Sequence, residues 1–131
     1  SDTDGQVRLS VVKATAYRRF IEALEQGRPL VKPTVLQAIR IGPLGIYGAP
    51  FEIFQAIKND VLAEARAPVP IVLGVTNDSV SYAPDRTAAA RGGYAADQVP
   101  LMQGTLPLAN IHDELVEALL ALDSDLFPQT T

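Results

Sequence analysis

The apolar residues of this chain change their spacing several times, and these changes limit the folds that the chain can form. Over residues 6 to 13, apolar and polar residues alternate, which is the spacing of a half-buried strand. From Thr15 to Gly27 the apolar residues recur at helical spacing, and Pro29 follows as a stop. We therefore expect a strand and then a short helix at the start of the chain.

The middle of the chain shows two further strand-like segments, one helix and a buried strand. Residues 34 to 41 and 44 to 47 have strand character and are separated by a Gly42-Pro43 turn, which predicts a hairpin or meander. Helical spacing returns from Phe54 to Ala65. The continuous apolar run from Pro70 to Thr76 has the length and β-branched content of a fully buried strand, so we expect it near the middle of the sheet.

The last third of the chain combines loop chemistry with one clear helix. Residues 77 to 107 are rich in Asp, Ser, Pro and Gly, and we expect a long functional loop with one turn of helix at about residues 86 to 90. We expect the tail over residues 123 to 131 to fray. Asn110 is placed to cap a final helix, whose shared face consists of Ile111, Leu115, Leu119 and Leu122.

The order of these segments predicts the fold class. Strands and helices alternate along the chain, which predicts an α/β fold: a single-domain layered fold with a mixed β-sheet packed by helices. A length of 131 residues corresponds to one ordinary domain, so we expect a single domain over residues 1–131. With 47% hydrophobic and 20% charged residues, the composition excludes a disordered chain.

Charge and residue counts exclude several classes of function. The net charge is −4 and the basic residues are scattered, so we expect no nucleic-acid partner. The chain has no cysteine and one histidine, His112, so by itself it provides neither a thiolate nucleophile nor the histidines of the common zinc hydrolase sites. No apolar run approaches the roughly 20 residues that cross a bilayer, which predicts no transmembrane segment.

Glu52 is the first candidate site residue. Gly48 to Pro50 lead from a predicted strand into a predicted helix, which places Glu52 in the first helical turn at the edge of the sheet. Ligands collect at that edge in α/β sheets. The alternative is that Glu52 only complements the dipole of the helix.

A second group of candidates follows the apolar run. The side chains from Asn77 to Tyr82 should emerge at the same edge, so we expect Glu52 and Tyr82 to be near neighbours. The alternatives are an Asx turn at Asn77 and a Tyr82 ring that packs with its hydroxyl hydrogen-bonded. Arg91 to Tyr94 form a flexible turn that presents an aromatic residue, or a plain loop tip. We expect His112 to be a surface or capping residue rather than a ligand.

Three of these motifs occur in an order and at a spacing known from one family. They are Ile-Gly-x-Leu-x-Ile-x-Gly-x-Pro-x-Glu from Ile41, Asn-x-x-x-x-Tyr from Asn77, and Gly-Gly-Tyr from Gly92. Together they resemble the neutral/alkaline ceramidase family, and the resemblance covers roughly residues 34 to 122. Phe51, Ser81 and Ala95 stand where the family usually has Gly, Gly and Glu.

The resemblance implies a zinc amidase. Members of the family cleave the N-acyl bond of ceramide with two histidines, a glutamate and a tyrosine as zinc ligands and a zinc-bound water as nucleophile. On this chain the resemblance implies Glu52 and Tyr82 as metal ligands, Asn77 in the loop that leads to Tyr82, and Tyr94 as the catalytic residue that hydrogen-bonds the reacting carbonyl oxygen. It also implies a lipid amide as ligand.

The family's two histidine ligands belong to an earlier half of the domain that these residues do not include. Two oxygen ligands hold zinc poorly. We therefore expect the chain to be a fragment or a reduced relative of a larger catalytic domain. As an isolated chain it should neither bind zinc well nor catalyse amide hydrolysis.

A different class of function stays open, namely a non-catalytic domain that self-associates or holds a small ligand in the region from residue 77 to 107. A chain this apolar, reduced relative to a larger fold, should leave apolar surface uncovered, and such surface usually finds a partner. We therefore expect a homo-oligomer, with a two-fold dimer as the commonest form. The expected contact is the loop that contains Leu101, Met102, Leu106 and Leu108.

Overall fold

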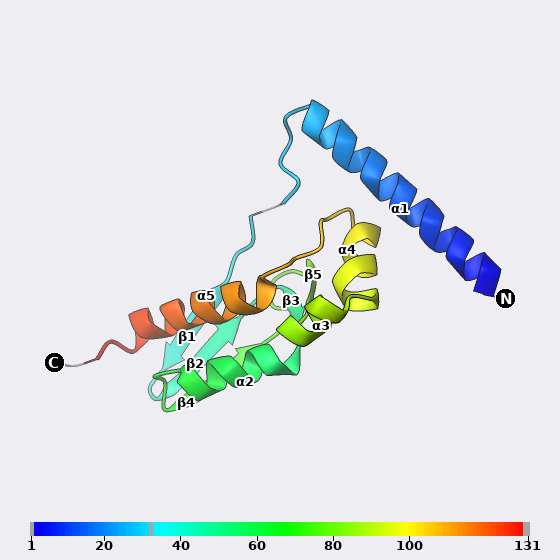
Figure 1. Ribbon diagram of the computed structural model, residues 1–131. Coiled ribbons are helices and arrows are strands. Elements are labelled where there is room, and N and C mark those ends of the chain that lie inside the picture. The colour runs from blue at the N-terminus through cyan, green and yellow to red at the C-terminus, as the bar shows by residue number, and fades with distance from the viewer. Residues whose placement is uncertain (1, 32, 130–131) are drawn as a thin grey trace.

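Eleven helices and strands make up the computed structural model, which describes residues 2–31 and 33–129 (Figure 1). They form an α/β domain in which helices pack on a mixed sheet, so the expected fold class is confirmed. In chain order the elements are α1 (Asp2–Glu25), β1 (Gln37–Ile41), β2 (Leu44–Gly48), β3 (Phe51–Ile53), α2 (Gln55–Glu64), β4 (Val69–Leu73), β5 (Ser81–Ala83), α3 (Arg86–Arg91), the π-helical turn η1 (Tyr94–Gln98), α4 (Val99–Met102) and α5 (Ile111–Leu126).

The larger sheet has three strands in the order β1-β2-β4. β1 and β2 form the expected hairpin, and Gly42 in its tight turn has a φ of 59°, the positive value that primed hairpin turns require. β4 runs parallel to β2 after the crossover through α2. The expectation that the apolar run lies mid-sheet is wrong, because β4 pairs with β2 alone in this sheet and forms one of its edges.

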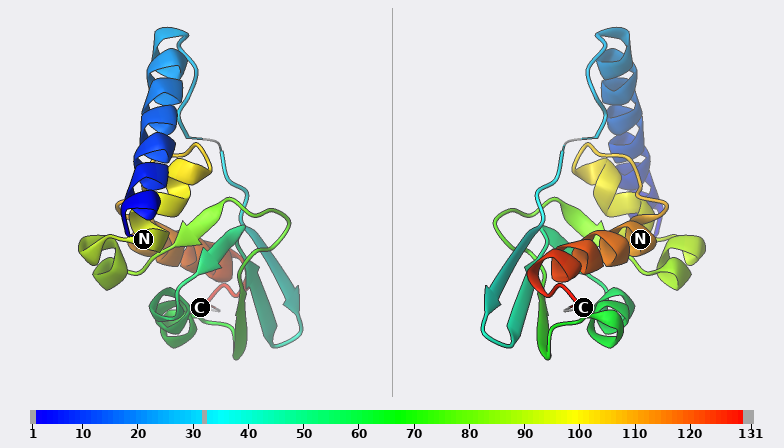
Figure 2. Two further views of the ribbon diagram at one scale, coloured as in Figure 1. Left: turned by 90° about the vertical axis from the view of Figure 1, so that its right-hand side faces the viewer. Right: turned by 90° about the vertical axis from the view of Figure 1, so that its left-hand side faces the viewer.

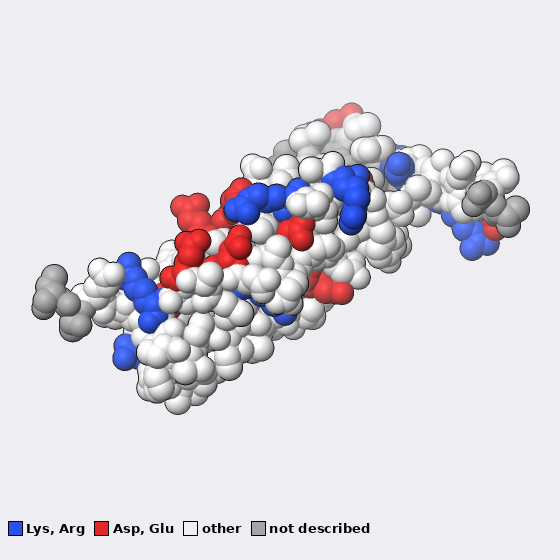
Figure 3. All heavy atoms as spheres, turned by 60° about the horizontal axis from the view of Figure 1, so that its bottom comes forward, with Lys and Arg blue, Asp and Glu red and all other residues white. Residues whose placement is uncertain are grey.

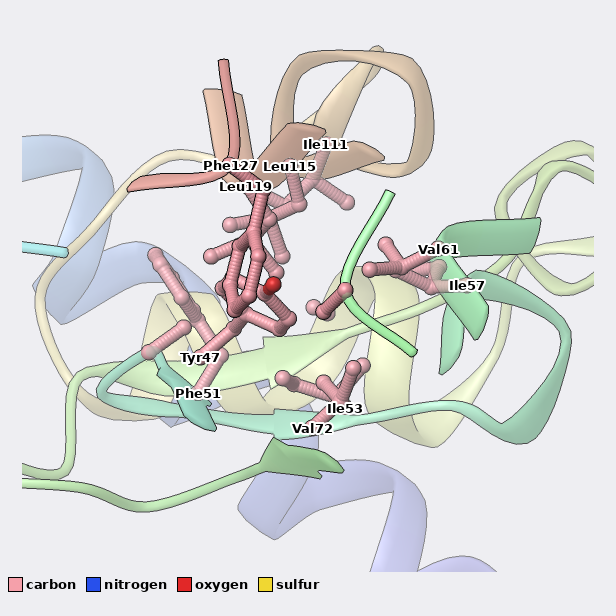
Figure 4. Packing of buried hydrophobic residues seen from close by; sticks show 13 residues of the cluster. Tyr47, Phe51, Ile53, Ile57, Val61, Val72, Ile111, Leu115, Leu119 and Phe127 are labelled. Atoms are coloured by element: carbon pink, nitrogen blue, oxygen red, sulfur yellow. The ribbon is translucent and has the colours of Figure 1, made fainter. Parts of the chain in front are cut away.

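The main core lies between the sheets and the helices α2 and α5. Leu115 and Leu119 on α5 point toward Tyr47 of β2 (Figure 4). Ile57 and Val61 of α2 are fully buried in the same cluster. The predicted apolar faces of these two helices therefore form the core, as the helical spacing indicated.

Asp123 is a buried carboxylate that ties three parts of the core together. It accepts a hydrogen bond from the Tyr47 hydroxyl, and the backbone amides of Arg66 and Ala67 donate to it at 2.7 Å and 3.0 Å. Burial, followed by the hydrogen bond to Asp123, raises the pKa of Tyr47. Gly45 leaves room for the Tyr47 side chain and for Ala67, because a Cβ atom at position 45 would lie 2.8 Å from both the Tyr47 Cζ atom and the Ala67 Cβ atom.

Residues 6 to 13 belong to helix α1, so the strand predicted there is wrong. Val7 and Val11 are four residues apart, a spacing that fits a helix as well as an alternating strand. No proline interrupts residues 2 to 25, and most residues there favour helix. The helix predicted from Thr15 onward is confirmed as the second half of α1.

Helix α1 packs against α4 at one side of the α/β body (Figure 1). Ala16 and Phe20 form a second small core with Leu101, and Leu106 packs on it. Leu108 packs on the main core, which leaves Met102, at 54% exposure, as the exposed member of the expected oligomer contact. The expectation that these side chains lack an element to cover them is therefore wrong for all of them except Met102, while an oligomer contact at this loop stays a prediction.

The region from residue 77 to 107 is far more regular than a long loop. It contains β5, α3, η1 and α4, of which only the helical turn at α3 was predicted. The Asp85 side chain caps α3 by accepting a hydrogen bond from the Ala88 amide at 2.8 Å. Several buried positions here are alanines, which do not produce a recognisable apolar period.

The carboxyl-terminal helix is anchored at its end. α5 continues to Leu126 and Phe127 is buried, so fraying from Asp123 is wrong for the residues up to Phe127. Arg40 donates a hydrogen bond to the Leu126 carbonyl at 2.7 Å, and its guanidinium lies 4.4 Å from the centre of the Phe127 ring. Asn110 occupies the N-cap position, but its side chain makes no capping hydrogen bond. Residues 130 and 131 lie outside the described residues.

The surface charges are mixed. On the face shown in Figure 3, Lys and Arg side chains lie beside Asp and Glu side chains rather than forming one continuous basic surface. Among the described residues, no helix has the length and apolar character needed to cross a membrane.

Candidate functional site

Glu52 and Tyr82 lie opposite each other on two parallel strands. β3 and β5 form a two-stranded parallel sheet in which Glu52 pairs with Tyr82. The flanking side chains of Phe51 and Ile53 on β3 point into the core, and so do those of Ser81 and Ala83 on β5. Because side chains alternate along a strand, Glu52 and Tyr82 both project from the outer face.

The expected proximity of Glu52 and Tyr82 is confirmed, but the local structure behind it differs from the prediction. Glu52 lies in a strand, and α2 begins only at Gln55. The chain stays extended because the Phe51 carbonyl accepts a hydrogen bond from the Val75 amide at 2.9 Å and the Phe54 amide donates to Ala83 at 3.1 Å. Glu52 is therefore a cross-strand neighbour of Tyr82 and does not lie in the first turn of a helix.

The two side chains interact directly. Glu52 raises the pKa of Tyr82 above its ordinary value of 10.0, first through side-chain hydrogen bonding and then through its negative charge. Glu52 is exposed and Tyr82 is half-buried, so the pair is open to solvent.

An aromatic row lies beside this pair. The Tyr82 ring contacts Phe54 on one side, with ring centres 6.2 Å apart, and Tyr94 on the other at 6.3 Å. Both contacts are edge-to-face, which is a favoured arrangement for aromatic pairs. The structure therefore brings Tyr94 to the same place as Glu52 and Tyr82, three residues that the sequence motifs singled out separately.

A short turn holds Tyr94 in this position. Gly92 and Gly93 have φ values of 72° and 107°, which residues other than glycine rarely adopt. The Asp97 side chain accepts a hydrogen bond from the Gly93 amide at 2.7 Å and so ties the turn to η1. Tyr94 remains 60% exposed, and its hydroxyl is accessible to a ligand.

Asn77 does not join this group in the structure. It has a positive φ of 64°, as Asn tolerates in turns, and its amide donates a hydrogen bond to the Gln37 side chain at the start of β1. Its interpretation as a turn residue is thus supported by its backbone.

His112 is expected to be a surface or capping residue, and the surface position is wrong. The side chain is buried, since the first turn of α5 packs near α2, and its Nε2 atom lies 2.8 Å from Asp60. The hydrogen bond with His112 lowers the pKa of Asp60, and the charge of Arg86 lowers it further. His112 therefore contacts Asp60, which also pairs with Arg86.

Two residues of this site were missed by the sequence analysis. Phe54 lies two positions beyond Glu52, and this period-two spacing was a signal for a shared strand face that the helix assignment hid. Asp97 acts through its bond to the backbone of Gly93, which no sequence motif indicated.

The donor set does not complete a zinc site. Among residues 2–31 and 33–129, no cluster of three or more His, Cys, Asp or Glu side chains is arranged to hold a metal. Glu52 and Tyr82 offer one carboxylate and one phenol as ligands, and the raised pKa of Tyr82 disfavours the phenolate that binds a metal best. Structural and catalytic zinc sites use three or four protein ligands, most often nitrogen or sulfur.

A hollow lined by residues between positions 86 and 113 is less suited to a ligand than the surface around Glu52 and Tyr82. It measures about 460 Å³ and is lined by residues that include Arg86, Asp97 and Asp113. Arg86 is paired with Asp113 at 2.5 Å, and Asp97 is bound to Gly93. Its charged groups are thus occupied by contacts within the chain.

No protein-family model, curated protein or solved structure matches this chain.

Proposed function

We propose that this chain is a ceramidase-like domain that carries part of a zinc amidase site. In this proposal Glu52 and Tyr82 are two oxygen ligands, and Tyr94 donates a hydrogen bond to the carbonyl oxygen of the scissile amide. The observation that supports it most is the cross-strand pairing of Glu52 with Tyr82, with the Tyr94 ring in contact with Tyr82. These residues come from three separate motifs of the resemblance.

The proposal assigns each side chain a chemical task. Glu52 supplies a negative charge at the outer face of the β3–β5 pair, opposite the hydroxyl of its cross-strand neighbour Tyr82. Tyr94 presents a hydroxyl next to a turn that the Asp97 side chain ties to η1, which suits a donor that must meet a carbonyl oxygen. When bound, the family's zinc would lower the pKa of a water and polarise the carbonyl.

The described donors do not hold that zinc alone, so we infer no hydrolysis by the isolated chain. Imidazole ligands would have to be supplied by residues other than these 131. The lipid amide implied by the resemblance fits an exposed polar pair beside an aromatic row, because the rings of Phe54, Tyr82 and Tyr94 offer apolar surface next to it. The substrate class is therefore proposed as an N-acyl amide with an apolar chain.

Zinc titration followed by calorimetry tests this proposal. We expect the wild-type chain at neutral pH to bind zinc more weakly than micromolar, since two oxygen ligands are a poor set for this metal. Glu52→Gln and Tyr82→Phe should remove the binding, because the first replaces the anionic carboxylate with a neutral amide and the second removes the hydroxyl oxygen. Glu117→Gln, which changes an exposed carboxylate on α5, is the matched control and should bind zinc like the wild type.

Two results would overturn the proposal: no zinc binding by the wild type even at millimolar metal, or binding that Glu52→Gln leaves unchanged. Affinity tighter than micromolar that Glu52→Gln abolishes would contradict the incomplete donor set instead, and would show that the chain holds zinc by itself.

A further inference from the structure

One face of the three-stranded sheet is uncovered and aliphatic. Tyr47 of β2 and Val72 of β4 point into the core, so their neighbours along each strand point the other way. Both views in Figure 2 show helices on one side of this sheet and, among the described residues, none on the other. The aliphatic residues that alternate outward, here called the open face, are Ile39, Ile41, Leu44, Ile46, Val69, Ile71 and Leu73, and the row of Leu73 is completed by Gln37 and Gly48.

The open face is continuous across all three strands. Ile39 pairs with Ile46, which pairs with Ile71, and Leu44 likewise connects Ile41 to Val69. Ile41 is 61% exposed and Val69 is 50% exposed. No charged side chain belongs to these two rows, so the surface is flat, apolar and without charges that a partner would have to neutralise.

The sequence of β4 points independently to a second layer. A strand with apolar residues on both faces is typical of a sheet that is covered on both sides. The inner face of β4 is covered by the core, and its outer residues Val69, Ile71 and Leu73 are between 40% and 50% exposed. β4 thus has the composition of a strand between two layers, and the chain itself supplies one.

The size of the open face fits a dimer of this chain. Seven aliphatic side chains at this exposure expose on the order of 500 Å², the upper part of the range that soluble monomers leave uncovered. Two such faces together would bury on the order of 1,000 Å², which is about the least that a specific interface needs. A smaller apolar surface would not reach this limit.

We propose that the open face binds the open face of a second copy of this chain. The two sheets would pack face to face at about 10 Å, as in other stacked sheets, around a two-fold axis. A second copy is the occupant that this face fits, because an uncharged aliphatic surface matches itself without any charge pairing. The inference is independent of the proposed zinc site, since no residue of the open face takes part in it.

The exposed stripe of helix α1 is the competing contact. Five large apolar residues of α1 are between 53% and 63% exposed, namely Val7, Val11, Tyr17, Ile21 and Leu24, but they lie on a single helix beside exposed charged side chains such as Glu22. A substitution on α1 is therefore the matched control for one on the sheet.

Sedimentation and light scattering test the interface. The wild type should have twice the 14.0 kDa mass of one chain. Ile71→Lys should halve the mass while the far-ultraviolet circular dichroism stays the same, because its side chain is on the open face and not in the core. Ile21→Lys should keep the mass of two chains. A 14.0 kDa wild type at high concentration, or loss of the dimer with Ile21→Lys alone, would overturn the proposal.

A cross-linking experiment covers the case in which Ile71→Lys does not fold. The chain has no cysteine, so a single one can be introduced without interference. Ile46→Cys lies on the central strand and should form an intermolecular disulfide on mild oxidation, while Leu62→Cys on α2 should not. Cross-linking at position 62 but not at 46 would place the contact on the helices and contradict the proposal.

Discussion

The buried carboxylate of Asp123 accepts three hydrogen bonds. We expect Asp123→Ala to lower the free energy of unfolding by about 3 kcal/mol, because it leaves the Tyr47 hydroxyl and two backbone amides without an acceptor in the core. Asp125→Ala, an exposed position on the same helix, should change it by less than about 0.5 kcal/mol. Urea unfolding measures both, and equal effects would contradict the structural role of Asp123.

The sequence predicted some residues of the candidate site and missed others, because contacts that depend on strand pairing or helix packing leave no local pattern. Glu52 and Tyr82 could be predicted as neighbours because short motifs mark them directly. The contact of Phe54 with Tyr82 depends on the pairing of β3 with β5, which no local pattern indicates. His112 was placed wrongly for the same reason, since its burial depends on the packing of α5 near α2.

At the scale of elements, helix α1 shows that the spacing of apolar residues over a few positions does not by itself determine secondary structure. A short alternating segment fits both a strand and a helix, and the surrounding sequence decides between them. β1, β2, α2 and α5 were predicted well because each combines a clear period with a breaker at its end. β3, β5, η1 and α4 were not, because each has only three to five residues, too few to show a period.

The separate core beneath α1 predicts separate stability. Phe20→Ala should loosen α1 by about 2 kcal/mol, which corresponds to roughly 30-fold faster amide exchange in that helix. Exchange in α2 and α5 should stay unchanged, because Phe20 does not belong to the main core. Ile21→Ala, at an exposed position of α1, is the control. Hydrogen exchange that accelerates equally in α1, α2 and α5 would show that the two cores unfold together.

At the scale of the whole molecule, the α/β class followed from the order of local periods, but the covering of the sheet did not. Periodicity shows which residues are apolar and not which layer covers them. β4 was expected mid-sheet because both of its faces are apolar, and it lies at an edge with one face open. The proposed dimer would supply the second layer that this composition anticipates.

The pairing of Glu52 with Tyr82 is the central claim, and the pKa of Tyr82 tests it most directly. Nuclear magnetic resonance of the tyrosine rings during a pH titration separates Tyr82 from the other tyrosines. The pKa of Tyr82 should lie above 10.0 in the wild type and move back toward that value in Glu52→Gln, since the carboxylate is the main cause of the increase. Glu117→Gln should leave it unchanged. A Tyr82 pKa that is the same in the wild type and in Glu52→Gln would contradict the account.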